Sequence, residues 1–243
     1  GMDKEGEIDY LTKLINPNLG LITNISYAHI ENFKNLNQIA KAKSEIIENI
    51  MPGGTMVINR DDKYYNYFLK KAKNRYLKII TFSRKDKKAN VIYLDQKKYK
   101  KNYLMRFKIN KIIKSFLISK ELLNYKENLL ASLSIITNYF NVDKLSKKLF
   151  LNFKIPQGRG TIINYKKGLK NLTIIDESYN SNPLSLKSAI ENFNSIKTNN
   201  KKHMILGDML ELGKHSKKLH QKMSTIINST SIDKVNVFGK NIV

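Results

Sequence analysis

One histidine and one lysine lie in a short stretch whose pattern changes from strand to turn to helix. Leu19, Leu21, Ile22 and Ile25 form a short β-rich segment, in which Thr23-Asn24 places polar side chains where a strand would end. His29 follows in the turn, and residues 39–50 carry apolar side chains at helical spacing, which leaves Lys43 on another face. Because open α/β sheets bind ligands at the carboxyl ends of their strands, we expect His29 and Lys43 to converge on one site. The alternative is a solvated helix lysine and a turn histidine.

Two polar blocks in the second half of the chain also follow predicted strands. They read DESYNSNP (176–183) and LGDMLELG (206–213). For Asp176 the residues leave two interpretations open, a ligand-binding carboxylate and a helix cap or turn, since Asp accepts hydrogen bonds from free backbone N–H groups. Arg159 lies in KIPQGRG (154–160), where it is either a ligand-binding cation or a surface arginine near a hinge.

Strands and helices alternate in the first half, which predicts parallel pairing through right-handed crossovers. We expect helices at residues 8–15, 39–50, 64–74, 127–140 and 145–150, and strands at 19–25, 55–58 and 77–82. Lysine-rich turns separate the short β-rich runs 91–94, 103–107 and 112–118, so these predict an antiparallel meander. In the helix at 127–140, the spacing predicts that Tyr139 faces the core.

The second half is again an α/β region. Strands are expected at residues 161–165, 172–175, 203–206 and 235–238, and helices at 183–193 and 217–227. The Pro and Gly content of residues 154–160 is typical of a linker, so we predict domains at 1–155 and 156–243.

Composition restricts the compartment and the partners. The 243 residues include no Cys, which excludes a disulfide framework and thiolate metal sites and favours the cytoplasm. No apolar run reaches the roughly 18 to 20 residues that a membrane span needs, so we expect no membrane association.

A net charge of +24 and a pI near 9.9 would ordinarily indicate nucleic acid or an anionic surface. The excess is nearly all lysine and is spread along the chain, whereas base recognition favours arginine. We therefore expect no specific nucleic-acid partner. The alternative, a lysine-rich nucleic-acid or anionic-surface binding protein, has its best support in residues 97–114, where aromatic side chains interleave with lysines.

Four segments carry a family resemblance. TNISYAHIE (23–31) and AKSEI (42–46) resemble the central-domain signature of the Mur ligases, ATP-dependent amide-forming enzymes of bacterial cell-wall synthesis. DESYNSNP and LGDMLELG, the latter followed by Ser216 and His220, resemble blocks of the branch that adds D-alanyl-D-alanine, where the first usually reads DDSYNANP. The resemblance covers essentially the whole chain. It implies part of a central domain, a mostly parallel sheet with helices and a small meander, followed by part of a Rossmann-like C-terminal domain.

The resemblance also implies roles for individual residues. His29 would be a magnesium ligand, and Lys43 would be carbamylated and would also bind the metal. Asn128 would contact adenine, Arg159 the nucleotide phosphates and Asp176 the ribose, although Asn124-Tyr125 replaces the His-Asn pair usual before Asn128. A loop on the amino-acceptor side would include Ser178, Tyr179, Asn180 and Asn182.

The activity implied is that of a monomeric cytoplasmic ligase of peptidoglycan precursor synthesis, and hence of cell-wall growth, cell shape and division. With ATP and Mg2+ it would phosphorylate the terminal carboxylate of UDP-N-acetylmuramoyl-tripeptide, and D-alanyl-D-alanine would displace the phosphate. The sequence contains no G-x-x-x-x-G-K-[ST] phosphate loop, which lies further upstream in the family. We therefore expect a fragment without turnover of its own. A folded but non-catalytic remnant is a third possibility.

Overall fold

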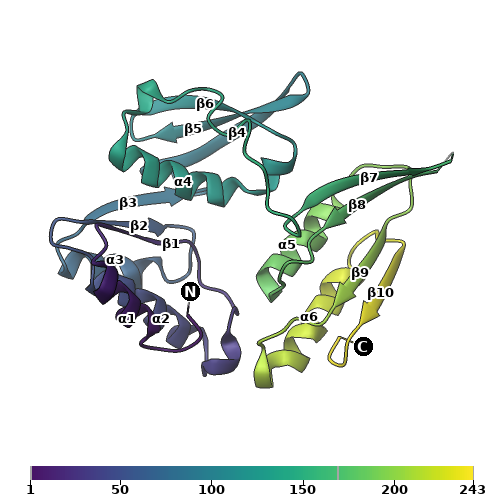
Figure 1. Ribbon diagram of the computed structural model, residues 1–243, viewed down its shortest axis with the longest axis horizontal. Coiled ribbons are helices and arrows are strands. Elements are labelled where there is room, and N and C mark those ends of the chain that lie inside the picture. Colours follow the sequence, from purple (N-terminus) through teal and green to yellow (C-terminus); the bar gives the residue numbers. More distant parts are fainter. Residues whose placement is uncertain (1, 169, 243) are drawn as a thin grey trace. The chain divides into compact units, whose positions relative to one another are not determined.

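The computed structural model describes residues 2–168 and 170–242, which form two compact units. One unit joins the residues before Ser26 to Ala40–Ile155 (Figure 1). The other joins Ser26–Ile39 to the chain from Pro156 onward. The short segment Ser26–Ile39 therefore packs with residues far along the chain.

The first unit contains a six-stranded sheet in which spatial order follows chain order. Its strands are β1 (Leu19–Ile22), β2 (Thr55–Asn59), β3 (Lys78–Ser83), β4 (Val91–Tyr99), β5 (Asn102–Ile109) and β6 (Ile112–Ile118). β1 to β4 pair in parallel, and β4 to β6 pair antiparallel. The predicted parallel sheet and meander are both confirmed, and they form one continuous sheet.

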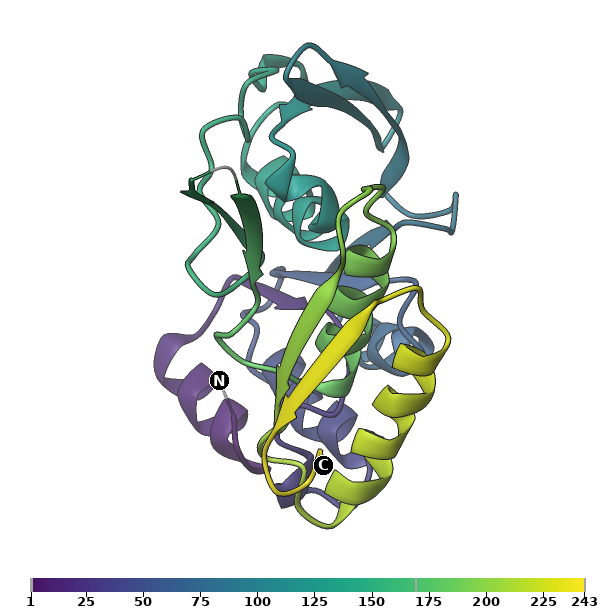
Figure 2. The ribbon, with the colours of Figure 1, turned by 90° about the vertical axis from the view of Figure 1, so that its right-hand side faces the viewer.

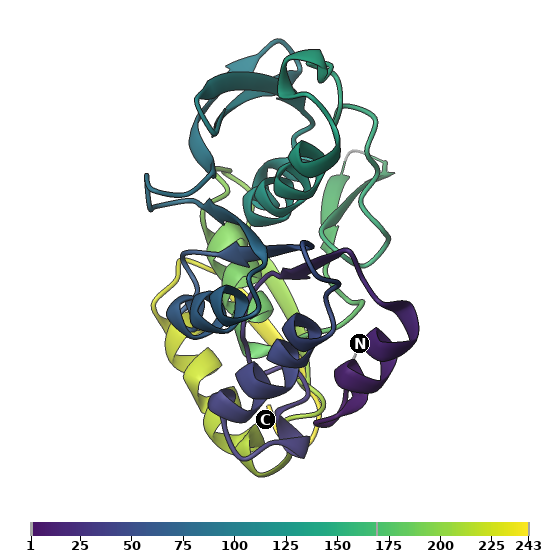
Figure 3. The same cartoon turned by 90° about the vertical axis from the view of Figure 1, so that its left-hand side faces the viewer.

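Helices cover both faces of the parallel strands because β2 is apolar on both sides. Met56 and Ile58 belong to the core beneath α2 (Leu36–Glu48) and α3 (Tyr65–Asn74). Val57, between them, belongs to the core beneath α4 (Lys126–Tyr139). Figures 1 and 3 show α4 on one side of these strands and α2 and α3 on the other. Strand residues buried on both faces are typical of parallel sheets.

The first helix, α1 (Glu7–Ile15), is tied to α2 through a carboxylate. Glu45 accepts hydrogen bonds from the backbone N–H groups of Gly6 and Asp9, at 2.9 and 3.0 Å. These donors lie at the N-terminus of α1, where the helix dipole favours a negative charge. Glu45 therefore ties the start of α1 to α2, the helix that carries Lys43.

Two local predictions are wrong. Residues 145–150 form turns rather than a helix, after the short 3-10 helix Val142–Lys144. Phe150 is buried there, with its ring 5.4 Å from that of Phe116, so tertiary packing outweighs the helical pattern. Tyr139 is 59% exposed, because in the last turn of α4 its neighbour Asn138 faces the sheet instead and accepts hydrogen bonds from Thr55 of β2 and Lys78 of β3.

Among the residues that the structure describes, the second unit contains two separate strand pairs and two α-helices besides the start of α2. The strand pairs are the antiparallel hairpin of β7 (Thr161–Lys167) and β8 (Lys170–Asp176) and the parallel pair of β9 (His203–Gly207) and β10 (Lys234–Phe238). The helices are α5 (Pro183–Asn194) and α6 (Ser216–Asn228), which contact each other and bury Ile190, Leu219 and Met223. Figure 2 shows β9 beside β10. In the described part of the chain, no helix has the length and apolar character needed to cross a bilayer.

Candidate functional sites

Lys43 lies at the carboxyl ends of β1 and β2, as predicted for the lysine of α2. Its ammonium nitrogen, Nζ, donates to the carbonyl oxygen of Asn24 at 3.1 Å. The side chain is half-buried, and burial lowers its pKa below the ordinary value, although the nearby Asp62 carboxylate acts in the opposite direction. At a given pH, the neutral amine is therefore a larger fraction of Lys43 than of an ordinary surface lysine.

Side chains from the end of β2 hold the chain that follows β1. Asn59 donates through Nδ2 to the carbonyl oxygen of Thr23 at 2.9 Å. Asp62 accepts the Ile25 N–H at 2.8 Å through one carboxylate oxygen and the Tyr64 N–H at 2.8 Å through the other. Because these bonds fix the backbone around Asn24, they also fix the carbonyl that receives the Lys43 hydrogen bond.

A second group of predicted residues comes together where the linker meets the end of β8. Gly160 N–H donates to the backbone oxygen of Asp176 at 2.8 Å, and Tyr179 N–H donates to that of Gly158 at 3.0 Å. The guanidinium carbon of Arg159 lies 4.1 Å from the centre of the Tyr179 ring, a cation–π contact. The structure thus brings Arg159, Asp176 and Tyr179 into one group.

The carboxylate of Asp176 is held in its charged form. Ser178 N–H donates to Oδ1 at 3.1 Å. Hydrogen bonds from the side chain and the backbone of Ser178 are the largest causes that lower the pKa of Asp176. Burial has a smaller, opposite effect, and the Gly158 N–H lowers the pKa slightly further. The turn interpretation and the ligand interpretation of Asp176 are therefore compatible.

The rest of the predicted acceptor loop has clear local roles. Asn182 is the N-cap of α5, because its Oδ1 accepts the N–H groups of Leu184 and Ser185 at 3.0 and 3.1 Å. Pro at the first helical position and the returning Ser185 hydroxyl complete a capping box. Asn180 accepts the following N–H through its side chain. These contacts place Ser178, Asn180 and Asn182 along one ordered turn.

Asn128 lies in the first turn of α4 in the first unit, with an exposed side chain. Its neighbour Leu129 is buried in the core, so the helix turns the Asn128 side chain toward the surface. The structure thus leaves the Asn128 amide at the surface near a helix N-terminus.

His29 lies in the second unit, whereas Lys43 lies in the first. Their convergence on one site therefore stays a prediction. His29 has a left-handed backbone (φ 57°), and its Nδ1 lies 2.7 Å from a carboxylate oxygen of Glu211. The backbone oxygen of Glu211 also accepts the N–H of Glu31 at 3.1 Å.

Each unit contains one of the predicted magnesium ligands, Lys43 in the first unit and His29 in the second. Mg2+ usually keeps several waters and binds one or two protein carboxylates together with substrate phosphates. A carbamate on Lys43 would supply the anionic oxygens, and a histidine beside a carboxylate is a common arrangement in metal sites. Within residues 2–168 and 170–242, no three or more His, Cys, Asp or Glu side chains are grouped so as to hold a metal. These residues therefore fit magnesium only with ligands added by nucleotide and water.

The motif at 206–213 contains side chains whose hydrogen-bond partners the sequence did not predict. Asp208 accepts hydrogen bonds from the backbone N–H groups of Lys240, Asn241 and Ile242. Burial alone would raise the pKa of Asp208, but these bonds and that of the Asn241 side chain lower it. The buried His220 accepts the Met209 N–H at Nε2 at 3.0 Å. The motif itself could be recognised in the sequence, but the hydrogen-bond partners of Asp208 could not, because they lie more than 30 residues further along the chain.

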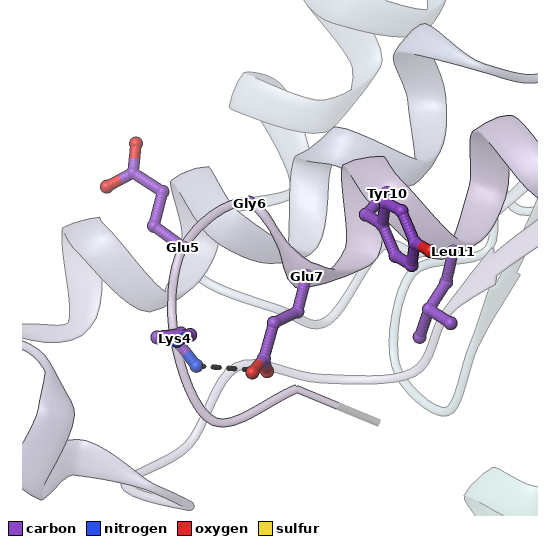
Figure 4. Close-up of a pocket in the computed structure, with 6 residues that line it drawn as sticks. All are labelled: Lys4, Glu5, Gly6, Glu7, Tyr10 and Leu11. Carbon is purple, nitrogen blue, oxygen red and sulfur yellow. Dashed lines mark hydrogen bonds between the residues drawn. The ribbon is translucent and has the colours of Figure 1, made fainter.

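A shallow hollow on the N-terminal segment is lined by none of the residues named above as candidates. Figure 4 shows the residues that line it, which are Lys4, Glu5, Gly6, Glu7, Tyr10 and Leu11. Glu7 accepts the Lys4 N–H across the turn at 3.2 Å. The hollow is thus formed by one helix start and contributes none of the predicted chemistry.

Taken together, these features define an α/β protein with polar groups at the carboxyl ends of parallel strands and a second α/β unit with its own charged loop. The family model for the Mur ligase middle domain matches residues 1–136. The family model described as Mur ligase, glutamate ligase domain, matches residues 158–242. The chain belongs to the Mur ligase family.

Curated relatives match along nearly the whole chain. UDP-N-acetylmuramoyl-tripeptide--D-alanyl-D-alanine ligase of Rickettsia prowazekii (strain Madrid E) is 32% identical over 240 residues, covering 98% of this chain and 52% of that protein. The protein of the same name from Bacillus subtilis (strain 168) is 30% identical over 244 residues, covering 99% of this chain and 50% of the relative. The chain therefore spans about half the length of the curated relatives it matches.

Solved structures share the fold. MurF from Acinetobacter baumannii superposes with a TM-score of 0.85 at 24% identity, covering 99% of this chain and 51% of that one. MurF ligase from Thermotoga maritima, in complex with ADP, gives a TM-score of 0.80 at 24% identity and covers 96% of this chain and 51% of that one.

Proposed function

We propose that this chain carries part of an ATP-dependent ligase that joins D-alanyl-D-alanine to UDP-N-acetylmuramoyl-tripeptide in peptidoglycan precursor synthesis. The observation that carries the proposal is the 32% identity, across 98% of the chain, to a ligase of that name. In this reaction ATP phosphorylates the terminal carboxylate of the tripeptide. The amine of D-alanyl-D-alanine then attacks the acyl phosphate, and phosphate leaves as the amide forms.

Lys43 is proposed to act as a carbamate. Its neutral amine would add to carbon dioxide and release a proton, which leaves an anionic oxygen donor on the helix. The burial that lowers the pKa of Lys43 supports this role, since only the neutral amine reacts. His29 is proposed as the second protein ligand of magnesium. When bound, magnesium would offset negative charge on the phosphoryl group being transferred.

The group around Asp176 is proposed to hold the nucleotide. A carboxylate with a lowered pKa remains an acceptor for ribose hydroxyl groups at neutral pH. The planar guanidinium of Arg159, held against the Tyr179 ring, suits two hydrogen bonds to a phosphate. Asn128 is proposed to contact adenine, and the ADP named in the T. maritima complex supports a nucleotide site in this fold.

The ordered turn after Asp176 is proposed to line the amino-acceptor side, through Ser178, Tyr179, Asn180 and Asn182. Asn182 would do so while capping α5. We further propose domains at 1–155 and 156–243, and a monomer that acts in the cytoplasm. The division of the chain into compact units between Ile155 and Pro156 supports this boundary, with the difference that Ser26–Ile39 groups with the second unit.

Nucleotide binding tests the proposal. Titration calorimetry of this chain with ADP and magnesium should give binding that Arg159→Ala and Asp176→Asn each weaken about tenfold or more, because a charged hydrogen bond is lost. Arg106→Ala and Asp95→Asn are matched controls, since these exposed residues pair with each other elsewhere. Absence of binding, or equal weakening by the controls, would contradict the proposal.

A further inference from the structure

Two segments that belong to different family domains are in contact within the second unit. Residues 29–31 lie in the range of the middle-domain model, and residues 211–213 lie in that of the C-terminal model. The 3-10 helices that follow, Ile30–Asn32 and Gly213–His215, contact each other. The Glu31 N–H donates to the Glu211 backbone oxygen at 3.1 Å. The motif LGDMLELG thus reaches the segment that carries His29.

Gly213 allows this contact because it has no side chain. A Cβ at this position would lie 2.8 Å from the Cβ of Glu31 and 3.0 Å from its Cα. These atoms belong to or adjoin the backbone and cannot rotate away. Gly213 also has a φ of 49°, in the left-handed region that favours glycine. Any other residue at 213 would therefore displace segment 29–31.

The side chains of His29 and Glu211 make a second contact between the same segments. His29 Nδ1 lies 2.7 Å from a Glu211 carboxylate oxygen. Both residues have left-handed backbones, with φ values of 57° and 59°. Non-glycine residues adopt this conformation at a cost that surrounding contacts must offset, and such residues concentrate at functional sites. The two strained residues meet each other.

We propose that Glu211 and Gly213 are positioning residues, which seat segment 29–31 on the second unit and orient the His29 ring for the reaction. This inference rests on the proposed function, because the chemical role of His29 does. The two halves of the 206–213 motif therefore have different structural roles. Asp208 and Met209 are held by residues 240–242 and by His220, whereas Glu211 and Gly213 hold the histidine segment.

Amide hydrogen exchange tests the seating on this chain itself. In Gly213→Ala, exchange at the Glu31 N–H should become about tenfold faster or more, because its bond to Glu211 is lost. Gly168→Ala is the matched control, since Gly168 has a similar φ of 59° but no atom within 4 Å of an added Cβ. Unchanged exchange in Gly213→Ala, or equal acceleration in both variants, would overturn the proposal.

The side-chain contact needs a different variant. Glu211→Gln keeps the backbone oxygen and the size of residue 211 but removes its charge. We expect the ring nitrogen resonances of 15N-labelled His29 to shift while exchange at Glu31 stays within about twofold of the parent chain. Glu191→Gln, which removes an exposed glutamate that pairs with Lys187, should leave the His29 signals unchanged. Unshifted His29 resonances in Glu211→Gln would overturn the positioning role.

These readouts are independent of nucleotide binding. If seating is lost as expected while the wild-type chain binds no ADP, the proposed function fails, and what stands is the seating of segment 29–31 by Glu211 and Gly213. If the chain binds ADP and neither variant changes the segment, the positioning inference fails alone.

Discussion

Lys43, on α2, and Asp176, at the end of β8, have pKa values that are lowered for different reasons. Burial lowers the pKa of Lys43 and so favours the neutral amine. Hydrogen bonds, chiefly from Ser178, lower the pKa of Asp176 and so favour the anion. The difference teaches that the two residues suit different chemistry. The neutral amine of Lys43 suits formation of a new covalent group, and the permanently charged carboxylate of Asp176 suits hydrogen bonds to a polar ligand.

The scaffolds behind the two sites differ in the same sense. Lys43 lies on a helix over a sheet whose strands are buried on both faces. Asp176 ends a two-stranded hairpin on which Leu172 is 55% exposed and Tyr165 is also exposed. Two-stranded hairpins have little stability of their own, whereas a sheet packed on both faces is rigid. We therefore expect the first site to depend on core packing and the second on local turn geometry.

Core truncation should have the largest effect and should affect only the first unit. Leu130→Ala removes a fully buried side chain beneath the sheet, so the free energy of unfolding should fall by about 2–5 kcal/mol. Leu172→Ala, on the exposed hairpin, should change it by about 0.5 kcal/mol or less. Denaturant titration measures both. Similar losses for the two variants would remove the proposed contrast between the scaffolds.

Turn geometry should have the next largest effect, and in the second unit. Gly158 and Gly53 share a φ of 75°, but a Cβ at 158 would lie 2.9 Å from the Tyr179 nitrogen, whereas one at 53 has no atom within 4 Å. Gly158→Ala should therefore reduce stability by about 1–3 kcal/mol more than Gly53→Ala does. Calorimetric unfolding compares them. An equal effect of the two substitutions would show that the close contact at Tyr179 is unimportant.

The smallest expected effect is a pH dependence at Lys43. Its folded pKa lies below the unfolded value of 10.5, so the folded chain binds fewer protons between these two values. Stability contributed by this residue therefore rises with pH through that window. In buffer free of carbon dioxide, Lys43→Met should be more stable than the parent at pH 7, by about 1 kcal/mol or less, and this advantage should vanish near pH 10.5.

A neighbouring lysine provides the opposite sign. The hydrogen bond to Glu5 raises the pKa of Lys41, so Lys41 adds stability below 10.5 that is lost as pH rises through the raised value. Lys41→Met should accordingly be the less stable protein at pH 7. If both variants changed stability in the same direction, burial would not be what distinguishes Lys43.

Local patterns predicted most of the fold because periodicity records which face of an element is buried. The helix of Lys43 and the strands of the meander follow from the spacing of their apolar residues. Residues 145–150 were predicted wrongly because Phe150 packs on Phe116, a contact across the fold. The exposure of Tyr139 depends likewise on tertiary contacts, because Asn138 rather than Tyr139 reaches the sheet from the last turn of α4.

The candidate sites were predictable only in part, for the same reason. The motif residues Lys43, Arg159 and Asp176 stand out in the sequence by type and position. The contacts that define their environments, such as Asp62 near Lys43 and Tyr179 under Arg159, join separate segments. The grouping of Ser26–Ile39 with the second unit could not be predicted from local sequence either. It involves contacts of His29 and Glu31 with Glu211 and Gly213, which lie far along the chain.

The carbamate on Lys43 is the most direct test of the account. The protein would be equilibrated with 13C-labelled bicarbonate and examined by 13C NMR for a lysine carbamate. The account predicts a carbamate signal in the parent chain and in Lys41→Arg, since Lys41 is exposed and its pKa is raised. It predicts no such signal in Lys43→Arg, because residue 43 then has no amine and the remaining lysines lack its burial. A signal that persists in Lys43→Arg, or its absence from the parent chain, would contradict the central claim that burial prepares Lys43 for this chemistry.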